Sequence, residues 1–279
     1  MVSRDFVPRR RAGCAHPPVA PSTEAAPGAA RRGAITAPDT SRRAALGSGV
    51  VALAAGPAGA WAAPAGHVVL LGDSVFDNAA YVAGGPDVVA HLRGRLPPGW
   101  RATLAAVDGA VTGDVGRQLG RVPTDATHLV VSVGGNDALR QEAVFAEGAR
   151  GVGEALFRLA EVRERFRQGY EATLDAVLGR GLPAAVCTIY DPRFPDPVRQ
   201  RLAVAGLALF NDAIARAAFA RGLPLLDLRL ICDAPGDYAN PIEPSVQGGA
   251  KIAHAIAELV TTHDFARRRP EVFTGRGRG

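Results

Sequence analysis

The stretch His67-Val68-Val69-Leu70-Leu71-Gly72-Asp73-Ser74 runs from a short apolar segment through a glycine to polar residues. The apolar segment shows no alternation with polar residues, which predicts a β-strand buried on both faces and ended by Gly72. A residue just beyond such a strand lies at the carboxyl edge of the sheet, where open parallel sheets bind their ligands. The stretch therefore predicts a parallel sheet with a candidate nucleophile, Ser74, at its ligand-binding edge.

Four further apolar runs follow, and stretches with helical spacing accompany them. The expected strands cover residues 101–107, 127–133, 182–190 and 223–228, and the expected helices cover 86–96, 112–121, 153–180, 196–221 and 248–262. Strands that alternate with helices form βαβ units around a parallel sheet. The sequence therefore predicts one three-layer α/β/α domain over residues 66–263, with five parallel strands.

The two ends of the chain differ from this domain in charge. The net charge is +5, but residues 1–65 hold 8 Arg against 3 acidic residues, and residues 264–279 hold 5 Arg against 2. The domain between them is slightly acidic, so it lacks the basic surface of a nucleic-acid-binding protein. Both ends lack apolar periodicity, which predicts a disordered N-terminal region and a disordered basic tail.

A candidate export signal lies in the N-terminal region. Arg42-Arg43 precedes a weakly apolar run, and Ala60-Trp61-Ala62 has the small-residue pattern of a cleavage site. These features predict a twin-arginine signal and a mature chain that begins near Ala63. The run is too short and too interrupted by glycine and proline to span a membrane, so no integral membrane segment is expected. The alternative is that residues 1–65 extend a cytoplasmic protein.

Residues at the next two strand ends suggest acyl transfer. Gly109 follows the second expected strand, and Gly134-Gly135-Asn136-Asp137 follows the third. Acyl transfer needs hydrogen-bond donors aimed at the developing oxyanion, and the amides of Ser74 and Gly109 with the Asn136 side chain would supply three. Alternatively, these glycines only form turns and Ser74 only caps a helix. Nucleotide-binding glycine motifs and zinc-ligand spacings are absent from the sequence, so no cofactor is expected.

In this order and placement the motifs resemble the SGNH/GDSL hydrolase family. In that family the nucleophilic serine lies in a G-D-S motif, which matches Ser74, and the oxyanion hole matches Gly109 and Asn136. The resemblance covers residues 67–262. It implies a flavodoxin-like sheet in the order 2-1-3-4-5 and a small-molecule ester as substrate. Asp73 and Asp137 are expected to accept hydrogen bonds in their turns, and we expect a monomer.

The fourth motif departs from the family. The resemblance leads us to expect D-x-x-H before the last helix, but Asn240 stands at the Asp position and Glu243 at the His position. We expect all six histidines to lie away from the carboxyl ends of the strands, with His67 and His128 at the opposite edge of the sheet and His263 at a frayed helix end. In one interpretation Glu243 is the base, within about 4 Å of the Ser74 hydroxyl. Asn240 or a backbone N–H would then donate to its carboxylate, and burial with nearby acids would raise its pKa.

Two other interpretations remain open. The site is catalytically silent and only binds a ligand, with Glu243 as a ligand contact or a loop residue. Alternatively, four carboxylates converge near the strand ends and bind Mg²⁺, Ca²⁺ or Mn²⁺, which prefer oxygen ligands. That set comprises Asp73, Asp77, Asp137 and Glu243.

Overall fold

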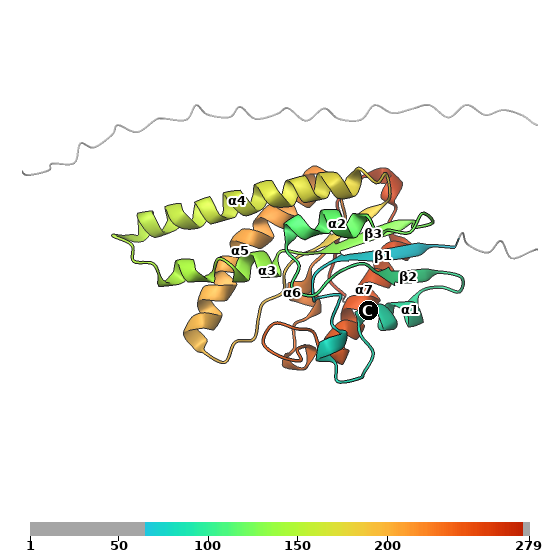
Figure 1. Cartoon of the computed structure of the whole chain (residues 1–279), viewed down its shortest axis with the longest axis horizontal. Helices are drawn as coiled ribbons and strands as arrows, with labels where there is room; N and C mark the ends of the chain where they lie inside the picture. Colours follow the sequence, from blue (N-terminus) through green and yellow to red (C-terminus); the bar gives the residue numbers. More distant parts are fainter. Residues whose placement is uncertain (1–64, 276–279) are drawn as a thin grey trace, which may run out of the picture. The chain divides into compact units, whose positions relative to one another are not determined.

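The computed structural model describes residues 65–275, so the candidate twin-arginine signal lies outside the described residues. Within this range a parallel sheet has the order β2-β1-β3-β4-β5-β6 (Figure 1). Its strands are β1 (His67–Gly72), β2 (Arg101–Leu104), β3 (His128–Ser132), β4 (Ala184–Cys187), β5 (Leu225–Leu226) and β6 (Val272–Phe273). The first five confirm the predicted strands and the order 2-1-3-4-5.

The sixth strand corrects the predicted domain boundary at residue 263. Phe273 is buried, and β6 pairs with β5 in parallel, with the Asp227 amide donating to the Phe273 carbonyl at 2.9 Å. His263 is also held, because its Nδ1 lies 2.8 Å from Glu271 Oε2. Residues 264–275 therefore belong to the domain and are not a disordered tail. A two-residue strand is too short for a periodic sequence signal.

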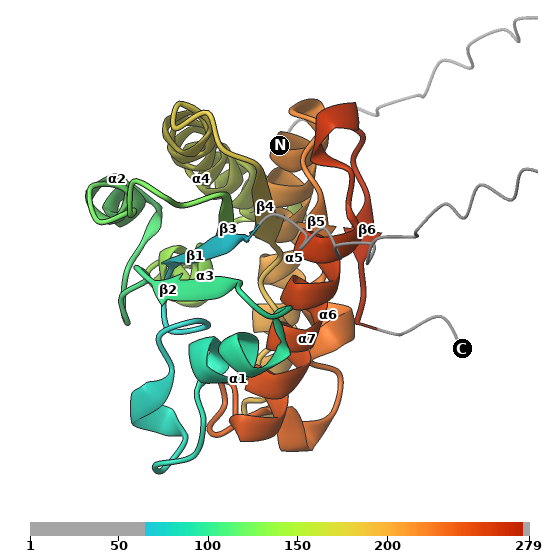
Figure 2. The same cartoon turned by 90° about the vertical axis from the view of Figure 1, so that its right-hand side faces the viewer.

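Helices cover both faces of the sheet. The main helices are α1 (Val88–Arg95), α2 (Val115–Leu119), α4 (Val152–Leu178), α5 (Pro197–Ala220) and α7 (Val246–Thr262). Figure 2 shows α2 and α4 on one side of the strands and α1 and α7 on the other. Short elements complete the chain: α3 (Gly135–Leu139), α6 (Leu228–Ile231), η1 (Ala79–Tyr81), η2 (Thr112–Asp114), η3 (Glu142–Ala146), η4 (Pro235–Asp237) and η5 (Phe265–Arg267).

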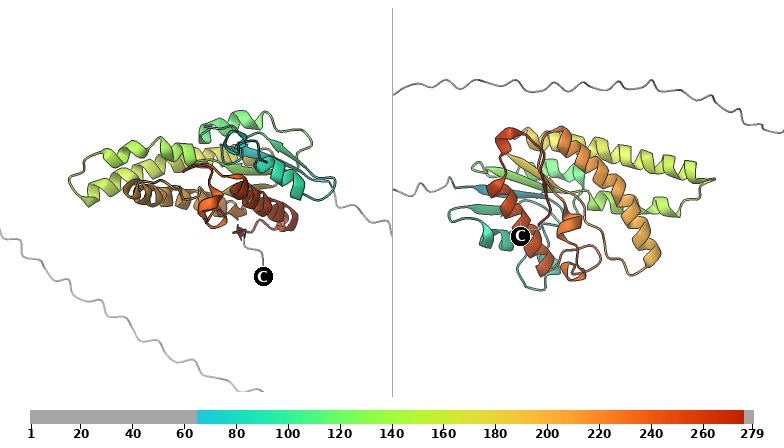
Figure 3. Two further views of the ribbon diagram at one scale, coloured as in Figure 1. Left: turned by 90° about the horizontal axis from the view of Figure 1, so that it is seen from below. Right: turned by 180° about the vertical axis from the view of Figure 1, so that it is seen from behind.

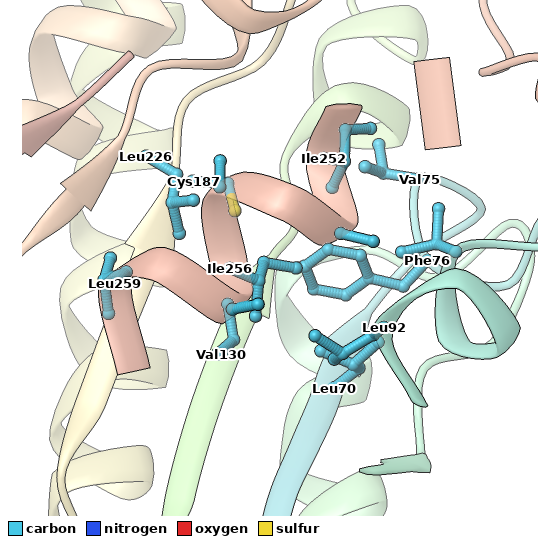
Figure 4. Packing of buried hydrophobic residues seen from close by; sticks show 14 of the residues in the cluster. Leu70, Val75, Phe76, Leu92, Val130, Cys187, Leu226, Ile252, Ile256 and Leu259 are labelled. Carbon is cyan, nitrogen blue, oxygen red and sulfur yellow. The ribbon is translucent and has the colours of Figure 1, made fainter. Parts of the chain in front are cut away.

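Strand β1 contributes to two hydrophobic cores. Val68 and Leu70 pack in the core that includes α1 and α7, where Figure 4 shows Leu70 beside Phe76. Val69 and Leu71 point to the opposite face, into the core that α2, α4 and α5 complete. This arrangement confirms the interpretation of the continuous apolar run, because successive side chains of a strand point to opposite faces.

Helix α5 is the one helix in the described range that is long and apolar enough to cross a membrane. It lies beside α4 (Figure 3), and it contributes Phe210 and Ile214 to the core. Burial in the protein core therefore accounts for apolar residues of this helix.

The end of β1 requires a glycine. Gly72 has φ +128°, and a Cβ atom there would lie 1.7 Å from the Ser132 carbonyl oxygen at the end of β3. The side chain of Gln118 fixes the same residue, because it accepts from the Gly72 amide and donates to the Gly72 carbonyl, both at 2.7 Å. Gly72 thus fixes the point at which the chain leaves the sheet and turns into Asp73 and Ser74.

Candidate active site

Ser74 lies in the turn that follows β1. The amides of Phe76 and Asp77 both donate to the Asp73 carbonyl at 3.1 Å, which fixes this turn. The Ser74 side chain is buried, and its Oγ donates to Glu243 Oε1 at 3.0 Å. The expected contact between two residues 169 positions apart is therefore present in the fold.

The backbone of Glu243 is held on both sides within a tight loop between η4 and α7. Its amide donates to Asn240 Oδ1 at 3.0 Å, and its carbonyl accepts from the Ala239 amide at 2.9 Å. The Ile242 amide also donates to Asn240 Oδ1, at 3.0 Å. The prediction that Asn240 or a backbone N–H donates to the Glu243 carboxylate is therefore wrong for the described residues, because Ser74 is the donor to Oε1 and Oε2 has no hydrogen-bond partner. Asn240 accepts from amides two and three residues ahead, as Asn side chains do in turns.

Burial dominates the electrostatics of Glu243. It raises the pKa of Glu243 to about 7, with a further contribution from the charge of Asp108, while the Ser74 hydroxyl opposes the shift. Glu243 Oε2 is buried and has no hydrogen-bond partner among the described residues. A carboxylate that lacks donors is less stabilised in its charged form, so it holds its proton to a higher pH.

Asp73 is one of the nearby acids whose charge we expected to raise the pKa of Glu243, and this expectation is not met. Burial raises the pKa of Asp73 to about 8, with a smaller contribution from Glu243. The acidic group whose charge raises the pKa of Glu243 is Asp108, and Asp73 is not among the causes of that shift. Asp73 Oδ1 accepts from the Val75 amide at 3.1 Å, as expected of a turn acceptor.

Of the two other predicted oxyanion-hole residues, Asn136 bonds to the residue that follows Gly109. Asn136 lies in the first turn of α3, and its Nδ2 donates to the Ala110 carbonyl at 3.0 Å, next to Gly109. Gly109 has φ +76°, a left-handed conformation that suits glycine. Asn136 and Ser74 line the same pocket, whereas Gly109 lies outside its lining.

Asp137 points to a different element. Its carboxylate accepts from the Thr112 amide at 3.0 Å and from the Thr112 hydroxyl at 2.7 Å, which joins α3 to η2. Burial raises the pKa of Asp137 despite these bonds. As expected, it acts as a hydrogen-bond acceptor at its turn.

The four carboxylates of the metal-binding alternative do not come together in the described part of the chain. Asp137 is bonded to Thr112, and Asp77 Oδ2 accepts from the Asp108 amide at 2.9 Å. No group of three or more His, Cys, Asp or Glu side chains between residues 65 and 275 is placed to hold a metal ion. These bonds hold the carboxylates of Asp77 and Asp137 to two other segments of the chain.

Asn78 is a positioning residue that the sequence analysis missed. It is fully buried, its Oδ1 accepts from the Val88 amide at 3.0 Å, and its Nδ2 donates to the Pro244 carbonyl at 3.2 Å. Asn78 thus ties the segment after Ser74 to the loop that carries Glu243. An asparagine after a G-D-S motif indicates only a turn in sequence, because its partner lies 166 residues away.

One pocket of about 100 Å³ is lined by Ser74, Glu243, Asp73 and Asn136 together. The rest of its lining comes mainly from apolar residues of α3, η3, α4 and α5. The site therefore combines a hydroxyl, a carboxylate of raised pKa, an amide donor and an apolar cavity. This combination suits nucleophilic attack on a carbonyl group that carries an apolar substituent.

The comparisons with known proteins agree with this fold. The model of the GDSL-like lipase/acylhydrolase family matches residues 70–250. No curated protein matches this chain. An extracellular lipase from Streptomyces rimosus has a similar structure, with 22% identity over 67% of this chain and 95% of that chain, and a TM-score of 0.51.

Two further solved structures are similar. A lipase/acylhydrolase from Enterococcus faecalis has 19% identity, covers 72% of this chain and 96% of that chain, and has a TM-score of 0.48. A catalytic mutant of an acetylxylan esterase from Geobacillus stearothermophilus has 18% identity over 72% and 95% of the two chains, with a TM-score of 0.47. Identities this low bear on the fold alone.

The role of Asn240 as an acceptor predicts that Asn240→Ala and Asn240→Asp differ in their free energy of unfolding. Asn240→Ala leaves two backbone amides without their acceptor, so we expect it to lower the free energy of unfolding by about 1 kcal/mol. Asn240→Asp keeps an oxygen acceptor, so we expect it to stay within about 0.5 kcal/mol of the wild type. Urea unfolding of the three proteins measures both changes. Equal destabilisation by both variants would contradict the acceptor role.

Proposed function

This chain belongs to the GDSL-like lipase/acylhydrolase family and is a hydrolase that acts on ester bonds; on that premise we propose that Ser74 is its nucleophile and Glu243 its general base. The observation that carries the proposal is the 3.0 Å hydrogen bond from Ser74 Oγ to Glu243 Oε1. A nucleophile and a base within hydrogen-bond reach are the diagnostic arrangement for covalent catalysis.

The proposed reaction has two halves. Ser74 Oγ attacks the carbonyl carbon of the ester while Glu243 Oε1 takes the hydroxyl proton, which gives a tetrahedral oxyanion. The bond to the alkoxy oxygen then breaks, and Glu243 returns the proton to the leaving alcohol. Water attacks the acyl-serine in the same way, with Glu243 again as base, and releases the carboxylic acid and free Ser74.

The raised pKa of Glu243 supports its proposed role. An ordinary glutamate, with a pKa of 4.5, is a weak base for a hydroxyl proton at neutral pH. Burial brings the pKa of Glu243 to about 7, close to the pH at which a general base is most effective. The loop bonds at its amide and carbonyl support the geometry, because they fix the backbone from which the carboxylate reaches Ser74.

We propose that the amides of Ser74 and Gly109 and the Asn136 side chain stabilise the oxyanion. The bond from Asn136 Nδ2 to the Ala110 carbonyl supports this, because it orients the amide group and keeps it beside Gly109. A side-chain amide nitrogen has two hydrogens, so one remains for the substrate. Donors fixed before the reaction stabilise developing charge without reorganisation.

The second candidate function is ligand binding without turnover. It is favoured by the presence of Glu243 at the position where the family resemblance leads us to expect histidine. A carboxylate does not become a cation when it takes the proton, so it gives less stabilisation to the negative intermediate than an imidazolium does. The two functions differ in whether Ser74 is chemically activated.

Labelling with a fluorophosphonate probe separates these two functions. We expect the probe to form a covalent bond with Ser74 in the folded wild-type protein, because Glu243 assists removal of the hydroxyl proton. Ser74→Ala and urea-unfolded wild-type protein serve as controls and should stay unlabelled. Mass spectrometry of the digested protein identifies the modified residue. A folded wild-type protein that stays unlabelled would favour ligand binding.

The role of Glu243 predicts a distinct pH dependence. The carboxyl group accepts a proton only when ionised, so kcat/KM for a short-chain ester should rise with pH and reach half its plateau near pH 7. Glu243→Gln keeps the shape and removes the base, so we expect kcat/KM to fall by about 10²–10⁴-fold. Glu161→Gln, an exposed substitution on α4, is the matched control and should keep the wild-type profile. A Glu243→Gln enzyme with unchanged turnover would exclude the proposed base.

We propose that the protein is exported by the twin-arginine route, with cytoplasmic location as the alternative. Arg42-Arg43 and the Ala60-Trp61-Ala62 pattern support export. N-terminal sequencing of the protein purified from its own host should give a start near Ala63, and Arg42→Lys with Arg43→Lys should leave the chain uncleaved. An intact region 1–65 on a cytoplasmic wild-type protein would exclude the signal.

A further inference from the structure

The pocket beside Ser74 continues well beyond the polar groups. On α5 its lining runs from Phe210 through Gly206 to Ala203. Seven residues of α-helix span about 10 Å, so the lining extends about two helical turns. Across from α5, the lining includes Phe145 of η3 and Val162 of α4. Such a space suits a flexible hydrocarbon chain better than a polar group.

We propose that this pocket holds the acyl chain of the ester, and that the preferred substrates are esters of short, straight-chain acids of about four carbons. The inference rests on the proposed function, since it takes Ser74 as the atom to which the acyl group becomes bonded. It adds the substrate class and the residues that limit acyl length.

The acyl group fits this pocket better than the alcohol does. The carbonyl carbon must reach Ser74 Oγ and the carbonyl oxygen must reach Asn136, and both residues border the pocket. The chain attached to that carbon therefore continues into the apolar space. The alcohol must take its proton from Glu243 and then leave to solvent.

The polar groups near Glu243 suit the part of the site from which the alcohol departs. The charge of Asp108 acts on Glu243 and raises its pKa, and the Asp108 carboxylate accepts from the Tyr81 hydroxyl at 2.7 Å. Asp108 is exposed to solvent. A departing alcohol and an incoming water thus meet a hydrated, polar surface, whereas the acyl chain meets an apolar one.

Pocket size sets the expected chain length. The pocket volume is about 100 Å³. A protein cavity of ~150 Å³ accepts benzene, which has six carbons, so this pocket holds about four by proportion. Phe145 limits the space because its ring packs directly on α5: a Cβ atom at Gly206 would lie 2.8 Å from the ring atom Cζ. Gly206 thus allows the ring to sit where it narrows the pocket.

Hydrolysis of p-nitrophenyl acetate, butyrate and octanoate by the full-length protein tests the proposal. Each methylene that enters the pocket should raise kcat/KM by about fourfold. Butyrate has two more methylenes than acetate and should exceed it by about 16-fold, and octanoate should fall below butyrate. Ala203→Leu adds three carbons to the pocket and should bring the ratio of butyrate to acetate close to one. Phe145→Ala enlarges the pocket and should shift the preference toward octanoate.

Ala208→Leu is the matched control, because Ala208 is an exposed residue of α5 that does not line the pocket. It should keep the wild-type chain-length profile. Active Ala203→Leu and Phe145→Ala enzymes with that same profile would overturn the proposal. The two substitutions change pocket volume in opposite directions, so failure of one variant to fold still leaves the other as a test.

A wild-type protein that hydrolyses none of these esters would instead contradict the proposed function. The pocket is then tested by calorimetric titration with butyramide, a neutral molecule with the same acyl group. Binding to the wild type that is lost in Ala203→Leu would support a short-acyl pocket. Absence of binding to the wild type, or equal binding to both proteins, would overturn it.

Discussion

The fold and the site both depend on the complete burial of β1. All six of its residues are buried, so its side chains are shared between two cores and its backbone leaves the sheet only at Gly72. The close approach of Gly72 to the Ser132 carbonyl fixes the distance between the ends of β1 and β3. Ser74 and Asn136 follow these two ends, so their shared position at one pocket follows from strand packing rather than from any direct bond between them.

The site concentrates carboxyl groups whose charged forms are poorly solvated. Burial raises the pKa of Asp73 and of Glu243 above their ordinary values. A raised pKa in the folded protein means that ionisation works against folding as the pH rises through that value. The same desolvation that costs stability gives Glu243 its basicity, and Asn78 contributes to holding its loop in place. A buried carboxyl group, the proposed base, is thus retained at a cost to the fold, as is common at functional sites.

The Asn240 and Glu243 pair shows how a motif can keep its spacing and change its chemistry. At the family's Asp position, where a carboxylate is expected to orient the imidazole of a histidine, Asn240 instead accepts backbone amides of its own loop. Glu243 reaches Ser74 without a side-chain partner on its second oxygen among the described residues. Orientation of the base therefore comes from the loop backbone and the surrounding packing. The apolar pocket next to it depends on α4 and α5, which are far from these motifs in sequence.

Apolar periodicity and strand-end glycines are local signals, so they were enough to predict the α/β class, the first five strands, the main helices and the order of the motif residues. The sequence also predicted that Ser74 and Glu243 approach each other, through the resemblance of the motif order. Strand β6 was not predicted because a strand of two residues is too short to show apolar periodicity. Its burial depends on pairing with β5. Three features could be recognised only in the folded chain: the acceptor role of Asn240, the bridging role of Asn78 and the apolar pocket. Each of these features depends on contacts between backbone groups or helix faces that are far apart in sequence. Such contacts cannot be predicted from the type of each residue alone.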